Sequence, residues 1–197
     1  MVSNVNLNTG FPPMFLNAYI NSELKEFGLI PDGPNPLEPA VNQSQPFFPA
    51  QSPLSIEDIY NDNVYIRNNP DAIVIMYDRL VRFRPNAFYR NKREQLVYFI
   101  YAPNLSKLID TTRVIIECLD REDSSAQDMN LWLASNDILD EAGNAITPNV
   151  YFHNTKVYQA DESRDIVELA SARTLFINKL VIEYDYHTTD AVNARYT

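Results

Sequence analysis

The chain is poor in the residues that most catalytic loops require. Of its 197 residues only four are glycine, two are histidine and one is cysteine. The glycines lie too far apart to form the loops that bind phosphates or dinucleotides: Gly10, Gly28, Gly33 and Gly143. No G-x-S-x-G sequence occurs, so the nucleophile elbow of the α/β-hydrolases is missing. We therefore predict no catalytic residue and no enzymatic activity.

The single cysteine, Cys118, cannot form an intramolecular disulfide, so nothing requires an oxidising compartment. It lies in a predicted helix beside Ile115 and Leu119, where we expect a packed thiol rather than a nucleophile. The N-terminal residues lack the basic and apolar regions of a secretory signal. No run approaches the roughly 20 apolar residues that cross a bilayer. We expect a protein made in the cytoplasm that does not contact a membrane.

The two histidines do not predict a metal site. His153 and His187 fall on separate predicted strands. A metal ion would need them adjacent, with a carboxylate from Asp185 or Asp190. We therefore predict neither a bound metal nor a cofactor.

A cluster of acids gives an alternative hypothesis, a hydrolase or nuclease that uses a metal ion. Its candidate ligands are Asp120, Glu122 and Asp123. A turn between two helices explains the same acids, because negative charge is favourable where a helix begins.

Charge is distributed unevenly over an acidic chain. The formal net charge is −10, which argues against a general nucleic-acid binder. Six basic residues nevertheless fall together without an acid: Arg79, Arg82, Arg84, Arg90, Lys92 and Arg93. The segment from Asp120 to Glu141 holds seven acids and one base. Opposed patches of this kind can steer one copy of a protein onto another.

Two other interpretations of the basic segment remain open. The charges can form a solvated face. The segment also mixes arginines with Phe83, Phe88 and Tyr89, so a nucleic-acid-binding module using residues 79–93 is the alternative function. The acidic whole favours a protein partner.

Residues 1–55 form a section of their own in this interpretation, ahead of a domain at 56–197. Seven of the 13 prolines lie between Pro31 and Pro53, which predicts a long extended arm. Phe47 and Phe48 in this arm are candidate anchors for a neighbouring surface, and a disordered linker is the alternative. Before the arm, a helix is predicted from Pro13 to Phe27, with Gly28 as its stop and an apolar stripe of Phe15, Tyr19, Leu24 and Phe27.

The rest of the chain predicts an α+β fold. A half-buried strand is expected at 72–84 and a central strand at 95–101. Asn104 is expected to cap a helix that runs to Asp120, and a second helix carries Met129 and Trp132. The apolar face of the first helix is predicted from spacing as Leu105, Leu108, Ile109, Thr112, Ile115, Ile116 and Leu119.

Two further strands, at 150–159 and 174–187, complete the predicted domain. The second has one apolar face made of Phe176, Leu180, Ile182, Tyr184 and Tyr186. The element order predicts a mixed or antiparallel sheet, with two or so helices packed on one face.

Three sequence blocks resemble the neck and tail-completion proteins of contractile-tailed bacteriophages, particularly the T4-like group. The blocks are YDRLVRFRPNAFYRNKREQLVYFIY, LDREDSSAQDMNLW and FHNTKVYQADESRDIVELASARTLFINKLVIEYDYHT, within 72–188. No catalytic motif is part of this resemblance, and the arm at 1–55 lies outside it.

The resemblance implies a structural virion protein of the head–tail junction. Tail terminators of this kind form a six-fold ring that ends the tail tube and docks it to the neck. Expected partners are further copies of the chain, tail tube or sheath proteins, neck or connector proteins, and genomic DNA that passes through without specific binding. Whether the chain terminates the tube, terminates the sheath or sits in the neck stays open. The candidate interface residues come from charge and position: Arg79, Arg82, Arg84, Arg90, Lys92, Arg93, Phe47, Phe48, Asp120, Glu122 and Asp123.

Overall fold

The computed structural model describes residues 12–29, 47–49, 73–80, 92–121, 125–136, 138–139, 145–146, 148, 150–159, 165–168 and 174–188. Its helices are α1 (Pro12–Glu26), α4 (Leu105–Leu119) and α5 (Ser125–Ser135). The long strands are β2 (Val74–Leu80), β3 (Lys92–Ala102), β6 (Val150–Gln159) and β8 (Thr174–Thr188). The short strands are β1 (Phe47–Pro49), β4 (Ile138–Leu139), β5 (Ala145–Ile146) and β7 (Asp165–Glu168).

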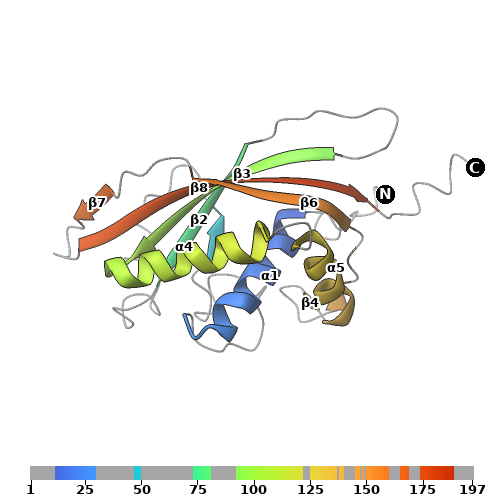
Figure 1. The fold of residues 1–197 in the computed structure, drawn as a ribbon, viewed down its shortest axis with the longest axis horizontal. Helices are drawn as coiled ribbons and strands as arrows, with labels where there is room; N and C mark the ends of the chain where they lie inside the picture. Colours follow the sequence, from blue (N-terminus) through green and yellow to red (C-terminus); the bar gives the residue numbers. More distant parts are fainter. Residues whose placement is uncertain are drawn as a thin grey trace, which may run out of the picture.

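One sheet organises these elements. Its centre is three antiparallel strands in the order β3, β8, β6, and β2 pairs antiparallel with the other side of β3. β1 adds to β2 in parallel, and β7 pairs with the opposite end of β8 from β6. The helices α1, α4 and α5 lie together on one side of the sheet (Figure 1). The predicted α+β sheet with helices on one face is therefore confirmed, with three helices in the described part.

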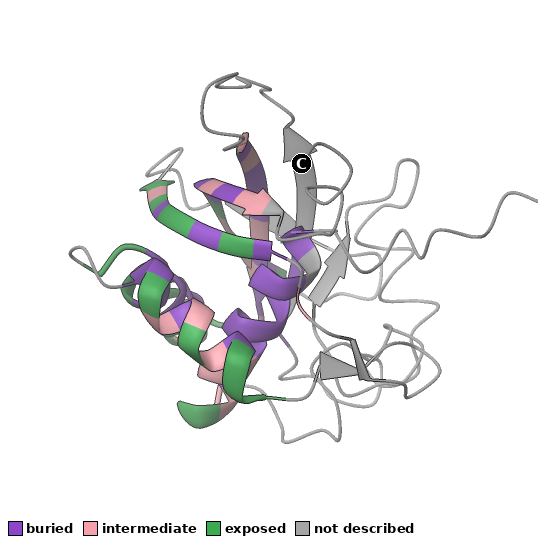
Figure 2. Ribbon diagram, turned by 90° about the vertical axis from the view of Figure 1, so that its right-hand side faces the viewer, coloured by how far each residue is buried: buried purple, intermediate pink, exposed green. Residues whose placement is uncertain are grey.

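The two faces of the sheet differ in composition because side chains alternate along each strand. In β3, Leu96, Tyr98 and Ile100 point to the helices and are fully buried. In β8, the predicted apolar face is confirmed, with Leu180 and Ile182 completely inaccessible. The buried residues of the helices gather against this side of the sheet (Figure 2). We call the opposite side, which carries Arg93, the outer face.

Helix α1 packs in the same core as the strands. Phe15, Leu16 and Ile20 have no exposed surface and belong to the apolar cluster that includes β3 and β8. The helix therefore shares a core with the 56–197 section, although the sequence places it with the arm. The predicted apolar stripe is wrong at its last residue. Phe27 follows the end of α1 and is 57% exposed.

Gly28 ends α1 as predicted. Its φ is +66°, the left-handed conformation that glycine adopts without a steric penalty. Gly28 N–H donates to the carbonyl of Lys25 at 2.9 Å, and Leu29 N–H donates to the carbonyl of Leu24 at 2.9 Å. This pair of bonds is a Schellman motif, and Leu29 packs against the core beside it.

Helix α4 begins where the sequence predicts, but its buried face is rotated. The side chain of Asn104 accepts from Lys107 N–H at 2.9 Å, which confirms the N-cap. Ile109 was expected in the core and is 44% exposed, whereas Thr111 and Val114 are buried. The spacing of apolar residues is compatible with several neighbouring faces of α4 as the buried one. The packing of α1 beside α4 determines which face is buried. Cys118 is buried as predicted, and burial raises the pKa of its thiol.

Most of the predicted arm lies outside the described residues, apart from β1. Within the part of the chain that the structure describes, no helix has both the length and the apolar character needed to cross a membrane.

Candidate functional site

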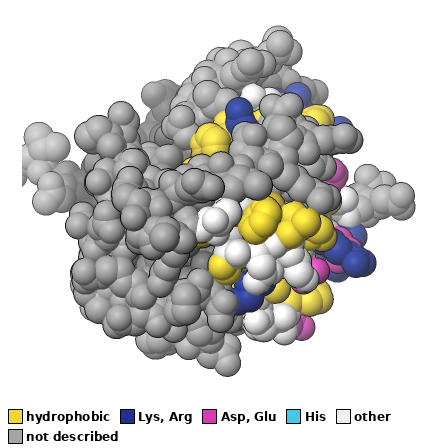
Figure 3. Space-filling model, turned by 90° about the vertical axis from the view of Figure 1, so that its left-hand side faces the viewer, with side chains coloured by type: hydrophobic (Ala, Val, Ile, Leu, Met, Phe, Trp, Pro, Cys, Tyr) yellow, Lys and Arg dark blue, Asp and Glu magenta, His cyan; other side chains and the backbone are white. Residues whose placement is uncertain are grey.

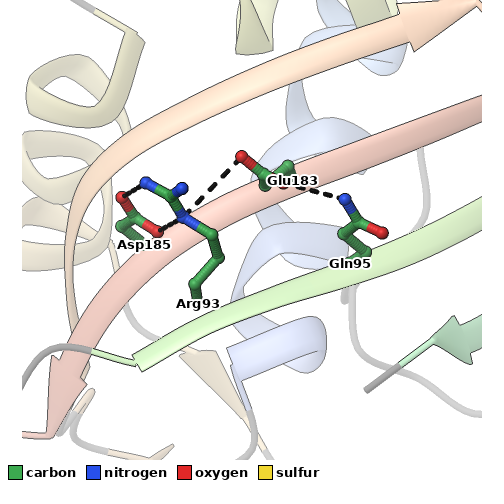
Figure 4. Close-up of polar contacts among 4 residues, drawn as sticks. All are labelled: Arg93, Gln95, Glu183 and Asp185. Carbon is green, nitrogen blue, oxygen red and sulfur yellow. Dashed lines mark hydrogen bonds and ion pairs between the residues drawn. The ribbon is translucent and has the colours of Figure 1, made fainter. Parts of the chain in front are cut away.

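The outer face of the sheet carries a polar cluster where β3 meets β8. Arg93 lies opposite Asp185 in the strand register, and Gln95 lies opposite Glu183. Arg93 donates two hydrogen bonds to the Asp185 carboxylate, each 2.6 Å long, and its Nε lies 3.7 Å from Glu183. Gln95 donates to Glu183 at 2.8 Å (Figure 4). The two strands are therefore joined by side chains as well as by their backbones.

Arg93 is engaged with its own chain rather than free. The side-chain hydrogen bond with Asp185 raises the pKa of Arg93, and the charges of Asp185 and Glu183 act in the same direction. Its side chain still has 44% of its surface exposed. Arg93 can thus touch a partner at the rim of this face, but with its charge largely offset by two carboxylates.

The two basic candidates whose side chains the structure describes, Lys92 and Arg93, do not share a patch. Lys92 and Arg93 are consecutive in a strand, so they point to opposite faces. Lys92 lies on the helix side, with its Nζ 5.7 Å from the ring centre of Tyr186. Arg79 stands opposite Leu96 in the β2–β3 register. Arg82, Arg84 and Arg90 fall outside the described residues.

Among the acidic and aromatic candidates, the structure describes Asp120 and the backbone of Phe47 and Phe48. Asp120 ends α4, and its carboxylate accepts from Val157 N–H of β6 at 3.4 Å. Glu122 and Asp123 lie outside the described residues. Phe47 and Phe48 form β1, where they stand opposite Ile75 and Met76 of the same chain.

Strand β6 is held by hydrogen bonds to the helices, two of them at its free edge. Asn130 of α5 donates to the carbonyl of Phe152 at 2.7 Å and accepts from Phe152 N–H at 3.0 Å. The Thr155 hydroxyl donates to the carbonyl of Leu119 at 2.5 Å. An edge strand with free backbone groups invites pairing with another chain. These contacts occupy part of that edge and tie it to the helical layer.

Exposed tyrosines alternate with polar residues on the outer face of β6. Tyr151 is 44% exposed and Tyr158 is 48% exposed. Asn154 and Lys156, also exposed, stand opposite Asp185 and Glu183 of β8. Tyrosine presents a rigid apolar ring with a polar end, which suits it to protein interfaces.

The two histidines of the chain meet on this face. His153 Nε2 and His187 Nδ1 are 2.6 Å apart, and the ring centres are 4.7 Å apart. The ring of Tyr151 lies 5.4 Å from His153 and 5.5 Å from His187. Burial and the neighbouring His187 lower the pKa of His153, while Asp185 acts in the opposite direction. Their meeting depends on an irregularity in the pairing of β6 between Phe152 and Asn154, which the sequence does not reveal.

A buried acid is a second feature absent from the sequence prediction. Glu94 is 1% exposed and accepts hydrogen bonds from the hydroxyls of Tyr184 and Tyr186, both 2.8 Å long. The sequence could have predicted this burial. Glu94 lies two residues before Leu96 and four before Tyr98, so the alternation of side chains in a strand places all three on the core face. Because both hydroxyl donors come from the neighbouring strand β8, we interpret Glu94 as a polar link between β3 and β8 within the core.

A shallow groove of about 330 Å³ lies between α4 and β8. Figure 3 faces this end of the molecule and shows hydrophobic side chains gathered beside charged ones. The lining residues are Leu108, Ile109, Thr112, Arg113, Ile116, Glu117 and Asn178. Arg113 and Glu117 pair across its rim at 2.6 Å.

Among the described residues no group of three or more His, Cys, Asp or Glu side chains is placed to hold a metal ion. Comparison with known proteins gives no further guide to identity. No protein-family model matches the chain, and no curated protein matches its sequence.

Proposed function

We propose that this chain is a non-catalytic structural protein that assembles with copies of itself at the head–tail junction of a contractile-tailed phage. The ring that it forms completes the tail and docks it to the neck. The proposed location at the head–tail junction rests on the three sequence blocks that resemble tail-completion proteins. The carrying observation from the structure is the outer face of β6, β8 and β3, with its exposed tyrosines and paired charges.

This surface suits a subunit contact of moderate polarity. Tyr151 and Tyr158 supply aromatic area, while Lys156 and Arg93 lie among the carboxylates of β8. Interfaces between separately folded partners combine aromatic residues with a polar rim in this way. A ring needs a contact between two different surfaces, so the outer face would meet a second region of the neighbouring copy.

Backbone pairing between copies is a poorer route to assembly at β6. Asn130 satisfies both backbone groups of Phe152, and Asp120 accepts from Val157 N–H. A new strand added along this edge would have to displace these contacts. We therefore propose docking through side chains of the outer face.

The alternative, a nucleic-acid-binding module at residues 79–93, receives less support. Arg93 is held by Asp185 and Glu183, and Lys92 lies on the opposite face of the strand. Phosphate binding would require several cations on one surface. If the alternative were correct, the logarithm of the binding constant would fall with the logarithm of salt concentration by about 0.9 for each phosphate contact.

Replacing one tyrosine tests the proposed contact surface. Tyr158→Ala should weaken self-association at least tenfold, because interface hot spots are enriched in tyrosine and their truncation costs about 2 kcal/mol or more. Tyr158→Phe is the matched control, because it keeps the aromatic ring and removes only the hydroxyl. Sedimentation velocity over a range of concentrations measures both variants. Equal association of the wild type and Tyr158→Ala would remove the outer face of β6 from the interface.

A further inference from the structure

The chain has two histidines in 197 residues, and both lie in one contact. They come from strands that are adjacent in the sheet but separated by more than 30 positions in the sequence. Their facing atoms are the ring nitrogens, His153 Nε2 and His187 Nδ1, at 2.6 Å. Two imidazole nitrogens this close together can supply two ligands of one metal site.

The pairing of β6 with β8 explains how the rings meet. Tyr151 stands opposite His187, and Asn154 stands opposite Asp185, so His153 is the extra residue of a bulge. A bulge changes the direction of a side chain relative to its partner strand. Tyr151 contacts both rings and restricts their orientation.

We propose that His153 and His187 form an open, two-imidazole site for a late first-row divalent metal ion, with copper(II) bound most tightly. Imidazole suits copper, nickel and zinc, whereas magnesium and calcium prefer oxygen ligands. Affinity at such sites follows the order in which copper exceeds nickel and zinc. Water completes the coordination.

The geometry requires only a small adjustment. Metal–nitrogen bonds of about 2.0–2.1 Å place the two nitrogens about 2.9 Å apart at the cis angle of a tetragonal copper(II) site, and about 3.3 Å apart at a tetrahedral angle. The observed separation is 2.6 Å, so the rings must move apart by less than about 1 Å. His153 lies on an exposed part of the strand, which leaves room for this movement.

The protons balance without an external base. In the present contact one facing nitrogen carries the hydrogen and the other accepts it. Metal binding requires a lone pair on both His153 Nε2 and His187 Nδ1. Each neutral ring then holds its hydrogen on its other nitrogen, so the change is a shift of tautomer with no net loss of a proton.

The carboxylate whose charge acts on His153, that of Asp185, is engaged by Arg93. Both oxygens of Asp185 accept hydrogen bonds from Arg93 at 2.6 Å. The sequence analysis requires adjacent histidines together with a carboxylate for a metal site. The structure brings the histidines together, but the carboxylate of Asp185 bonds to Arg93 instead. A two-ligand site binds more weakly than a closed structural site, and exchangeable binding is expected.

Copper(II) titration followed by electron paramagnetic resonance tests the site. The wild-type chain should take up one copper per chain, with hyperfine structure from two imidazole nitrogens. The double variant His153→Gln/His187→Gln should lose this signal, and each single substitution should weaken binding at least about tenfold. Asn154→Ala is the matched control, because it changes an exposed neighbour on the same strand and keeps both rings.

Calorimetric titrations with nickel, zinc and magnesium complete the experiment, with circular dichroism as a check that the variants are folded. Nickel and zinc should bind the wild type and not the double variant, and magnesium should bind neither. Identical copper and nickel isotherms for the wild type and the folded double variant would overturn the proposal. So would a copper signal from the wild type without two imidazole nitrogens.

Discussion

Glu94 shows at the scale of a single residue how this fold accommodates an acidic side chain in its core. A buried carboxyl group is costly unless donors replace the water that it loses. Tyr184 and Tyr186 supply two such donors from the neighbouring strand, and both rings remain in the apolar cluster. The hydrogen bonds also fix the register of β3 against β8, because a shift by one residue would separate them.

Removing one of these donors should destabilise the protein. Tyr186→Phe keeps the ring but deletes the hydroxyl that donates to Glu94. We expect a loss of about 1–3 kcal/mol in the free energy of unfolding, because a buried acceptor loses a partner. Urea denaturation measures the change, and Tyr151→Phe, on an exposed ring, is the control. A loss no larger than that of the control would show that the bond to Glu94 contributes little.

Removing the acidic group of Glu23 in α1 should stabilise the protein at neutral pH. Burial raises the pKa of Glu23, and the neighbouring Glu26 adds to the shift. A raised folded-state pKa means that the favourable contribution is present at low pH and is lost as the pH rises through that value. Glu23→Gln should therefore raise the melting temperature at pH 7, and the gain should vanish below the ordinary carboxyl pKa of 4.5.

Thermal unfolding at the two pH values measures this effect. Glu117→Gln is the control, because Glu117 pairs with Arg113 on an exposed turn and its loss should not stabilise. A gain for Glu23→Gln that is as large at low pH as at pH 7 would contradict the electrostatic explanation.

Residue contacts are the level at which the sequence predicts least. The charge pattern groups Lys92 with Arg93, but alternation in a strand sends them to opposite faces. Neither the pairing of Arg93 with Asp185 nor the meeting of His153 and His187 follows from local pattern. Both depend on the register between strands that are far apart in the chain.

At the scale of elements, the edge of β6 is protected by an amide. Asn130 reproduces the donor and acceptor of a neighbouring strand, since it bonds both backbone groups of Phe152. This explains how a long edge strand can avoid pairing its backbone with a strand of another copy, while its exposed tyrosine side chains stay accessible.

Asn130→Ala should weaken this edge. We expect a loss of about 1–2 kcal/mol in unfolding free energy, because two backbone groups lose their partner. The amide of Phe152 should also exchange its hydrogen faster. Asn154→Ala, at an exposed position of the same strand, should change neither measurement. Unchanged exchange at Phe152 in Asn130→Ala would contradict the proposed role of the amide.

Substitutions of Gly28 should destabilise the protein through the backbone conformation at this position rather than through steric clashes of the new side chain. Its φ is +66°, and nothing lies within 4 Å of an added Cβ. Gly28→Ala should therefore cost about 1–2 kcal/mol from the left-handed backbone alone. Gly28→Asn should cost less, because asparagine tolerates this conformation better. Equal losses in urea denaturation for both variants would point to a cause other than the backbone angle.

Elements with strong local signals were predictable, and short ones were not. Asn104 and Gly28 marked helix ends, and the long alternations at β6 and β8 marked strands. The short strands β4, β5 and β7 carry too few residues for a periodic pattern. The buried side of α4 was also missed in part, because α1 packs beside it from a distant part of the sequence.

At the scale of the whole molecule, the described fold presents two different surfaces. The helical layer encloses the core, while the outer face of β3, β8 and β6 carries tyrosines and paired charges. A molecule with two distinct surfaces can form a closed ring when one surface contacts the other on the next copy. Such a ring is the central claim of the proposed function.

The native mass of the purified protein over a range of concentrations tests this claim most directly, with negative-stain images of the same samples. A closed oligomer with one defined copy number, six in the arrangement that the resemblance implies, is the predicted result. A strict monomer at every concentration would contradict self-driven assembly through the outer face of the sheet.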